Sequence, residues 1–70
     1  MDTGDKIRVL RIDKGMTQAQ LARAVGVDRT SISKYEAGSV ENLKRHITMR
    51  LSEVLECSPG YLMGFEEVIR

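Results

Sequence analysis

Four polar side chains follow an aspartate near the middle of the sequence, at a spacing suited to reading the edges of nucleic-acid bases. Arg29 and Thr30 come directly after Asp28, and Ser33 and Lys34 follow one helical turn later. A guanidinium group can donate two parallel hydrogen bonds to O6 and N7 of guanine, and a threonine can offer its methyl group to a thymine methyl. A lysine can reach a base or a phosphate. These residues therefore form a candidate recognition surface, provided that a helix holds them together.

A short helix is expected to precede this surface. Thr17 and Gln20 have the spacing of a capping box, in which each side chain accepts a hydrogen bond from the backbone N–H of the other residue. Gly26 should end the helix after about two turns, because glycine readily adopts the left-handed conformation of a sharp reversal. The apolar face of this helix consists of Leu21, Ala22 and Val25.

The helix that carries the candidate surface should begin after Asp28. Aspartate is a favourable N-cap, and its carboxylate suits the positive end of the helix dipole. The helix is predicted to run from Arg29 to about Ala37 and to stop at Gly38, with Ile32 and Tyr35 directed inward.

Small and apolar residues would fix the angle between these two helices. Ala22 is small where the helices must approach closely, and Gly26 permits the turn between them. Leu21, Val27 and Ile32 would form the apolar wedge that sets the crossing angle. This arrangement is a helix-turn-helix, whose second helix can enter the major groove of DNA.

Three further helices are expected around this motif. The first spans residues 3–14 and stops at Gly15, with Ile7, Leu10, Arg11 and Lys14 on one face. A polar loop over residues 39–42 leads to a longer helix over residues 43–57, whose apolar positions are Leu43, Ile47, Leu51, Val54 and Leu55. Ser58 as N-cap and Pro59 at the first position then start a short fifth helix, which carries Tyr61, Leu62 and Phe65.

One cysteine and one histidine are too few for the sites that stabilise many short chains. Seventy residues make one domain and bury only about 60% of the unfolded surface. Cys57 has no partner for an intrachain disulfide, and with His46 alone it cannot make the usual zinc site. We expect a buried Cys57, an exposed His46, and no metal or cofactor. The core must come from helix packing, with dimerisation as a further source of burial.

The charges are distributed unevenly along the chain. Residues 1–50 hold ten Lys/Arg and six Asp/Glu, whereas residues 51–70 hold one Arg and four Glu, so the net charge of +1 hides a basic and an acidic end. No segment approaches the roughly 20 apolar residues that span a bilayer. The N-terminus lacks the apolar stretch of a secretory signal, and a lone thiol fits a reducing compartment, so we expect a cytoplasmic protein.

The segment GMTQAQLARAVGVDRTSISKYEAG resembles the helix-turn-helix of the Cro and phage-repressor type, also called XRE-like. The resemblance extends to IRVLR and to SEVLECSPGYLMG, and covers about 60 of the 70 residues. It implies an all-α fold, a compact five-helix bundle of the lambda-repressor-like type with the helix-turn-helix at the second and third helices. The usual role of such domains is transcriptional repression.

The same resemblance implies roles for individual residues. The positions that match phosphate-binding or groove-wall residues are Thr17, Gln18 and Ser31. Those that match base-reading and groove-facing positions are Arg29, Thr30, Ser33 and Lys34. Arg11 and Glu36 match a pair that often forms a structural ion pair.

The loop after Gly38 departs from the family pattern. Ala37 stands where an asparagine is frequent, no proline opens the fourth helix, and the stretch from Glu36 to Leu55 is about one residue longer than is common. The residues of this region that could meet a phosphate strand are Asn42, Lys44 and Arg45.

These observations predict a sequence-specific DNA-binding regulator that reads a palindromic operator as a homodimer. The chemistry of an enzyme is lacking, since there is no nucleophile–base pairing, no glycine-rich phosphate loop and no metal set. The acidic C-terminal end leaves an alternative open, an antitoxin or adaptor that uses this fold mainly to hold a protein.

Residues 1–65 are expected to form the DNA-binding domain, and residues 66–70 a C-terminal tail or the start of a linker to a further domain or protein partner. Phe65, Val68 and Ile69 have helical spacing, so they would either cap the core or contribute to a dimer contact.

Overall fold

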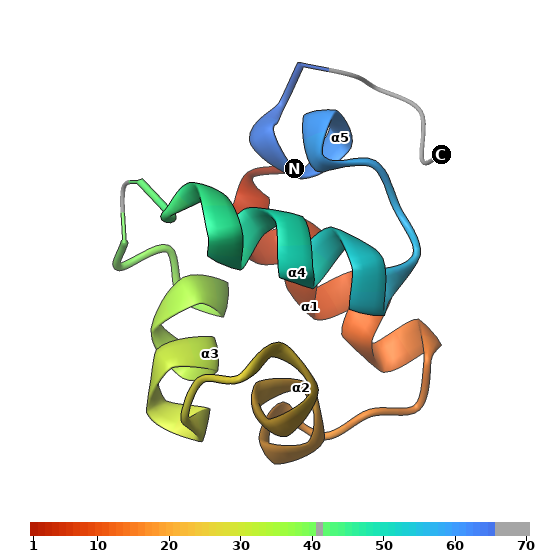
Figure 1. The fold of residues 1–70 in the computed structure, drawn as a ribbon, viewed down its shortest axis with the longest axis vertical. Helices are drawn as coiled ribbons and strands as arrows, with labels where there is room; N and C mark the ends of the chain where they lie inside the picture. The colour runs from red at the N-terminus through yellow and green to blue at the C-terminus, as the bar shows by residue number, and fades with distance from the viewer. Residues whose placement is uncertain (41, 66–70) are drawn as a thin grey trace.

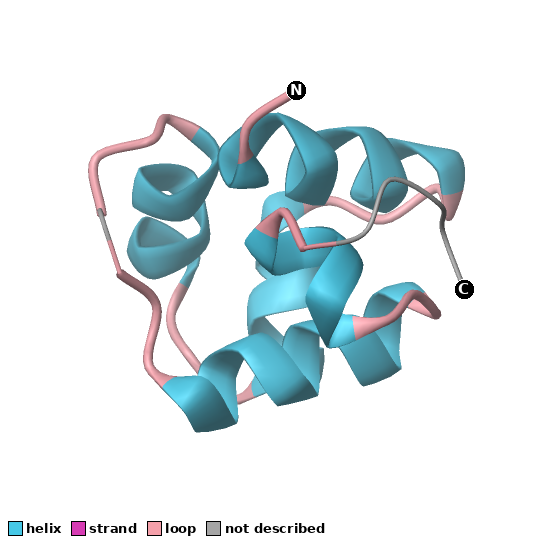
Figure 2. Cartoon of the chain, turned by 90° about the horizontal axis from the view of Figure 1, so that it is seen from above, coloured by secondary structure: helices cyan, strands magenta, loops and turns pink. Residues whose placement is uncertain are grey.

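Five α-helices form in the part of the chain that this computed structural model describes, residues 1–40 and 42–65. They are α1 (Thr3–Asp13), α2 (Gln18–Val25), α3 (Arg29–Glu36), α4 (Arg45–Leu55) and α5 (Pro59–Met63). Figure 2 shows helices joined by loops, with no strand among the described residues. The all-helical fold predicted from the sequence is therefore confirmed.

The predicted helix starts are capped by the expected side chains. Thr17 Oγ1 accepts a hydrogen bond from Gln20 N at 3.0 Å, and Thr17 N donates to Gln20 Oε1 at 2.8 Å, which completes the capping box. Ser58 Oγ accepts from Tyr61 N at 3.0 Å, with Pro59 at the first helical position. Gly26 ends α2 with a left-handed φ of 92°, as the sequence predicted.

Helix α4 is shorter than predicted. It begins at Arg45 rather than Leu43, after Lys44, which supplies no side-chain cap. It ends at Leu55 because Glu56 takes a left-handed conformation with φ of 58°, so Cys57 lies outside the helix. Leu43 still packs against the core from the preceding loop. For Leu43, the apolar spacing therefore predicted contact with the core correctly, whereas its prediction of helix at this residue was wrong.

The placement of Phe65 in the fifth helix was wrong. Gly64, with φ of 88°, ends α5 after Met63, and the following Phe65 is 79% exposed. Phe65 therefore does not cap the core. The other two members of the proposed apolar set, Val68 and Ile69, lie outside the described residues, as does the predicted tail over residues 66–70.

Apolar side chains from all five helices and from the α4–α5 turn meet in one core. Its buried members are Ile7, Leu10, Leu21, Ala22, Val25, Ile32, Leu51, Leu55, Cys57, Tyr61 and Leu62. In Figure 1, α2 and α3 lie at one end of the molecule and α5 at the other, with α1 and α4 between them. The helix-turn-helix thus rests on α1 and α4, and α5 closes the opposite side of the core.

Cys57 is buried and His46 is exposed, as predicted. Burial raises the pKa of the Cys57 thiol. The described residues contain no group of three or more His, Cys, Asp or Glu side chains that could hold a metal ion. None of the five described helices has the length and apolar character needed to cross a bilayer.

Side chains of α1 hold α5 against it. Thr3 Oγ1 donates to the carbonyl oxygen of Leu62 at 2.7 Å, and Lys6 Nζ donates to that of Tyr61 at 2.8 Å. The same ammonium group lies 4.6 Å from the centroid of the Tyr61 ring, within the range of a cation–π interaction. Two carbonyl groups at the end of a five-residue helix are thereby satisfied by a helix from the other end of the chain.

Helix α1 also meets the end of α3 at very short range. A Cβ atom built on Gly4 would lie 2.6 Å from the carbonyl oxygen of Tyr35 and 2.7 Å from that of Glu36. Because both neighbours are backbone atoms, they cannot rotate away as a flexible side chain could. Glycine at position 4 therefore lets the first turn of α1 approach the last turn of α3.

An ion pair between α1 and α3 lies beside this contact. Arg11 Nε donates to Glu36 Oε2 at 2.6 Å and Arg11 Nη2 to Glu36 Oε1 at 3.1 Å, while Arg11 Nη1 donates to the carbonyl oxygen of Met16 at 2.9 Å. The side chains are only 13% and 5% exposed. The hydrogen bond to Glu36 raises the pKa of Arg11. One guanidinium group thus links α1 to α3 and to the segment that enters α2.

Replacing Gly4 with alanine should destabilise the fold. The added methyl group would overlap two carbonyl oxygens, and overpacking of this kind costs about 1–3 kcal/mol. Urea unfolding followed by circular dichroism measures the change. Arg8→Ala, at an exposed position of the same helix, is the control and should change the free energy of unfolding by less than about 0.5 kcal/mol. Equal stability of the two variants would contradict the close approach of α1 and α3.

Replacing Glu36 with alanine should cost about 3 kcal/mol, because it leaves a largely buried guanidinium group without its partner. The double variant Arg11→Met with Glu36→Leu, which removes both charges and keeps apolar volume, should be more stable than the single variant. Thermal and urea unfolding of the two variants and the wild type test this. If the double variant were the less stable one, the single loss would not reflect an uncompensated charge.

Candidate nucleic-acid interface

The exposed side of α3 carries the predicted recognition residues. Arg29, Thr30 and Lys34 are exposed, whereas Ser31 and Ser33 are half-buried. Ile32, on the opposite side of the helix, is fully buried in the core. The side chains of Thr30 and Lys34 form no hydrogen bond or salt bridge with another described residue. The buried side fixes the rotation of α3, so its polar side chains are presented to solvent.

A chain of hydrogen bonds connects the Arg11–Glu36 ion pair to the first residue of α3. Gln18 Nε2 donates to Glu36 Oε1 at 3.1 Å, and Arg29 Nη1 donates to Gln18 Oε1 at 3.4 Å. The amide group of Gln18 is thus orientated by an acceptor on one side and a donor on the other. Through it, the base-reading candidate Arg29 is tied to the start of α2.

This arrangement leaves Gln18 able to fulfil its expected contact with phosphate. A glutamine amide has two N–H donors, and Glu36 uses one of them. The other N–H has no partner among the described residues. One side chain can therefore hold Arg29 and bind a phosphate oxygen simultaneously.

Thr17 and Ser31 differ in how free their hydroxyl groups are. Thr17 Oγ1 only accepts, from Gln20 N, so its own O–H is available to an external acceptor such as a phosphate. Ser31 Oγ donates its proton to Asp28 Oδ1 at 3.0 Å. A hydrogen bond from Ser31 to phosphate would therefore require the hydroxyl to change partner.

Asp28 is the N-cap of α3 and is exposed. Its Oδ1 atom accepts hydrogen bonds from both Ser31 N and Ser31 Oγ, each at 3.0 Å. These two hydrogen bonds are the main reason that the pKa of Asp28 is lowered, and the positive charge of Lys34 adds to the effect. The leading end of α3 therefore carries a carboxylate beside a guanidinium group.

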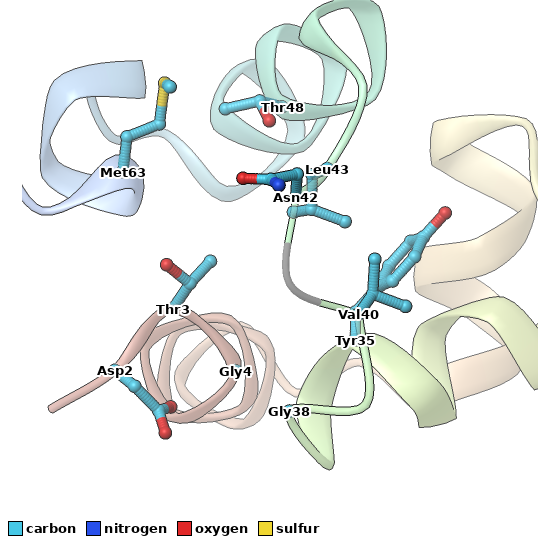
Figure 3. Close-up of a pocket in the computed structure, with 10 residues that line it drawn as sticks. All are labelled: Asp2, Thr3, Gly4, Tyr35, Gly38, Val40, Asn42, Leu43, Thr48 and Met63. Carbon is cyan, nitrogen blue, oxygen red and sulfur yellow. The ribbon is translucent and has the colours of Figure 1, made fainter.

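The three candidates in the loop and in α4 are not joined to this network. Lys44 and Arg45 are exposed at the start of α4, and no hydrogen bond or salt bridge in the described structure links them to α2 or α3. Asn42 lines a cavity of about 340 Å³ together with residues of α1, α3, α4 and α5 and of the α3–α4 loop. Figure 3 shows its amide directed toward the side of Met63. Asn42 is exposed, so its side chain is accessible to solvent while it lines this cavity.

Sequence reasoning assigned separate roles to Gln18, Arg29 and Glu36 but did not connect them. These contacts join residues that are 18 and 11 positions apart in the chain, and spacing within a single helix cannot reveal them. The sequence did contain one signal for this contact, the residue type at position 18. Gln18 carries an amide group at the start of α2, and a helix-turn-helix brings that point close to the start of α3.

Known proteins share this fold and sequence pattern. A solved structure of the P22 c2 repressor in complex with a synthetic operator is 33% identical in sequence, with a TM-score of 0.87 over 94% of this chain and 98% of the other. The HTH-type transcriptional regulator DicA of Escherichia coli is 34% identical over 64 residues, which is 91% of this chain and 47% of DicA. The HTH-type transcriptional activator BcrR of Enterococcus faecalis is 44% identical over 73 residues, or 99% of this chain and 33% of BcrR. The chain thus spans about half or less of the length of these two relatives.

The family model of the Cro/C1-type HTH DNA-binding domain matches residues 6–67. The match begins in α1 and extends past α5, so it includes the ion pair, the Gln18 network and the exposed side of α3. The five-helix bundle with a helix-turn-helix at α2 and α3 is likewise the fold of the P22 c2 repressor structure. The chain belongs to the Cro/C1-type helix-turn-helix DNA-binding family.

Proposed function

We propose that this chain is a cytoplasmic transcriptional regulator, acting as a repressor, that binds a palindromic operator in double-stranded DNA as a homodimer. The observation that supports this most directly is the position of Arg29, exposed at the start of α3 and held by Gln18. A guanidinium group fixed at the leading end of a helix is suited to bidentate contact with guanine in the major groove.

The remaining polar residues divide into two groups in this proposal. Contacts to the phosphate strands come from Thr17, Gln18, Ser31, Asn42, Lys44 and Arg45. Contacts to base edges come from Arg29, Thr30, Ser33 and Lys34. The phosphate contacts supply affinity and register, and the base contacts supply sequence preference.

The proposal that this chain represses transcription, and does not activate it, is based on its relatives. The P22 relative is named a repressor and BcrR an activator, so both directions occur among proteins similar to this chain. A domain that covers its operator represses whenever the operator overlaps a promoter, and this is the simpler arrangement because it needs no contact with polymerase.

Dimerisation is supported by apolar surface at the end of α5 and directly after it. Met63 is 54% exposed and Phe65 79% exposed, and large exposed apolar side chains close together mark contact surfaces. Two copies joined there would present two α3 helices to half-sites about one turn, roughly 34 Å, apart on DNA.

Arg29→Ala should relax the preference at one base pair and cost about 1–3 kcal/mol of binding free energy. Gln18→Ala should weaken binding to every sequence, and should also relax the preference at the same base pair, because Arg29 loses its acceptor. Selection of bound duplexes from a random pool, followed by gel shifts at several salt concentrations, measures both effects.

The charge-matched control for Arg29→Ala is Arg50→Ala. Arg50 lies on α4 and donates to the carbonyl oxygen of Ala24, in the second half of α2. Its loss should leave base preference unchanged. If Arg29→Ala retained the full preference of the wild type, the assignment of Arg29 as a base-reading residue would be wrong.

Phe65→Ser should separate dimerisation from DNA recognition. Removal of the exposed ring should weaken binding to a palindrome at least about ten-fold, a loss of 1.4 kcal/mol, while binding to an isolated half-site stays the same. Light scattering of the free protein and gel shifts on both DNAs test this. An unchanged affinity for the palindrome would remove Phe65 from the dimer contact.

A further inference from the structure

One side chain at the leading end of α3 has no role in the division of contacts given above. Asp28 is exposed, directly precedes Arg29 and carries a negative charge on a surface proposed to bind a polyanion. As an N-cap alone, a serine, threonine or asparagine would serve equally well without that charge. The negative charge suits the positive end of the α3 dipole. Unlike serine or threonine, aspartate also has a second oxygen beyond the one that caps the helix.

The two oxygens of this carboxylate are in different situations. Oδ1 accepts both hydrogen bonds from Ser31 and performs the capping. No hydrogen bond from another described residue uses Oδ2, and Asp28 forms no salt bridge with any of them. The backbone N–H of Asp28 itself and the charge of Lys34 act on the carboxylate more weakly than Ser31 does. Even Arg29, the next residue, directs its Nη1 atom to Gln18 instead. One oxygen is therefore held in place while the other is free to accept a hydrogen bond from outside.

The cap also limits the freedom of the free oxygen. Two hydrogen bonds from one residue to Oδ1 restrict rotation of the carboxylate, and they stabilise its ionised form, so that it acts only as an acceptor at neutral pH. An acceptor that is fixed in direction and cannot donate discriminates strongly among partners, because acceptors opposite it are repelled.

The major groove offers this acceptor one well-matched base. Guanine presents only acceptors there, and thymine presents an acceptor and a methyl group. Adenine presents an amino donor, but its N7 acceptor lies beside it and would oppose a carboxylate. Cytosine presents its N4 amino group with the O6 acceptor of the paired guanine on one side and the apolar C5–H group on the other, whereas the adenine amino group has an acceptor on each side. Acidic side chains accept from the cytosine amino group.

We propose that Asp28 is a specificity-determining residue, whose Oδ2 accepts a hydrogen bond from the N4 amino group of a cytosine next to the base pair that Arg29 reads. The inference rests on the proposed function, since it requires α3 to lie in the major groove. It adds to that function a defined feature of the half-site: a position for cytosine adjacent to a position for guanine.

Selection from a random duplex pool with three versions of the protein tests the proposal. The wild type should enrich cytosine at one position of the half-site. Asp28→Asn keeps the cap through Oδ1 but replaces the outward acceptor with an N–H donor, so cytosine should be lost and that position should shift to guanine, which presents only acceptors. Asp28→Ser keeps the cap with a shorter side chain and should show no preference there. Each preferred base should exceed the others at least about five-fold, the lower end of what one good base contact supplies.

Asp2→Asn is the matched control. Asp2 is also an exposed aspartate N-cap, and its Oδ1 accepts from Asp5 N at 2.9 Å at the start of α1. The same chemical change at that helix should leave every position of the selected sequence as in the wild type. Circular dichroism of all variants should show the helix content of the wild type, since serine and asparagine both cap helices.

The outcomes separate the two proposals. If the wild type selects no sequence at all, the proposed function fails. If the wild type selects a clear half-site but Asp28→Asn and Asp28→Ser select the same one, DNA recognition stands and Asp28 is only a helix cap. If the preference changes at a position not adjacent to the one that Arg29→Ala alters, the placement of Asp28 beside Arg29 in the groove is overturned.

Discussion

The contact between the guanidinium group of Arg11 and the carboxylate of Glu36 sets the geometry on which the rest of the structure depends. It joins the middle of α1 to the last turn of α3, and its third donor fixes the segment that enters α2. Because a buried pair of this kind stabilises little in total but tolerates few arrangements, its contribution is to orientation more than to free energy. The absence of a side chain at Gly4 then lets the two helices close to contact distance.

The interface follows from this pair in a short sequence of steps. Glu36 accepts from Gln18, Gln18 accepts from Arg29, and Arg29 stands at the solvent end of the series. A long, flexible side chain normally loses much conformational entropy when it binds a base. The hydrogen bond to Gln18 already restricts part of the freedom of Arg29. In the proposed contact with a base, the further loss of entropy would be smaller for that reason.

The sequence predicted local features well and contacts between distant residues poorly. Thr17, Gln20 and Ser58 mark helix starts because their caps depend on residues only a few positions away. The boundaries of α4 and the position of Phe65 were wrong because they depend on a left-handed Glu56 and on where the chain turns after α5, which tertiary packing decides. Arg11 and Glu36 were paired by family resemblance, whereas the Gln18 link, which periodicity within a helix cannot express, emerged only from the structure.

The attachment of α5 to α1 has a consequence for how the molecule opens. Five residues cannot sustain a helix in isolation, and the hydrogen bonds from Thr3 and Lys6 to the α5 carbonyls span 59 and 55 positions of the chain. Closing loops of such length costs conformational entropy, which other contacts of α5 must offset. The side chains of Tyr61 and Leu62 contribute to that offset by joining the buried core. The first turns of α1 and helix α5 therefore depend on each other: a change that unfolds the start of α1 leaves two α5 carbonyl groups without their donors.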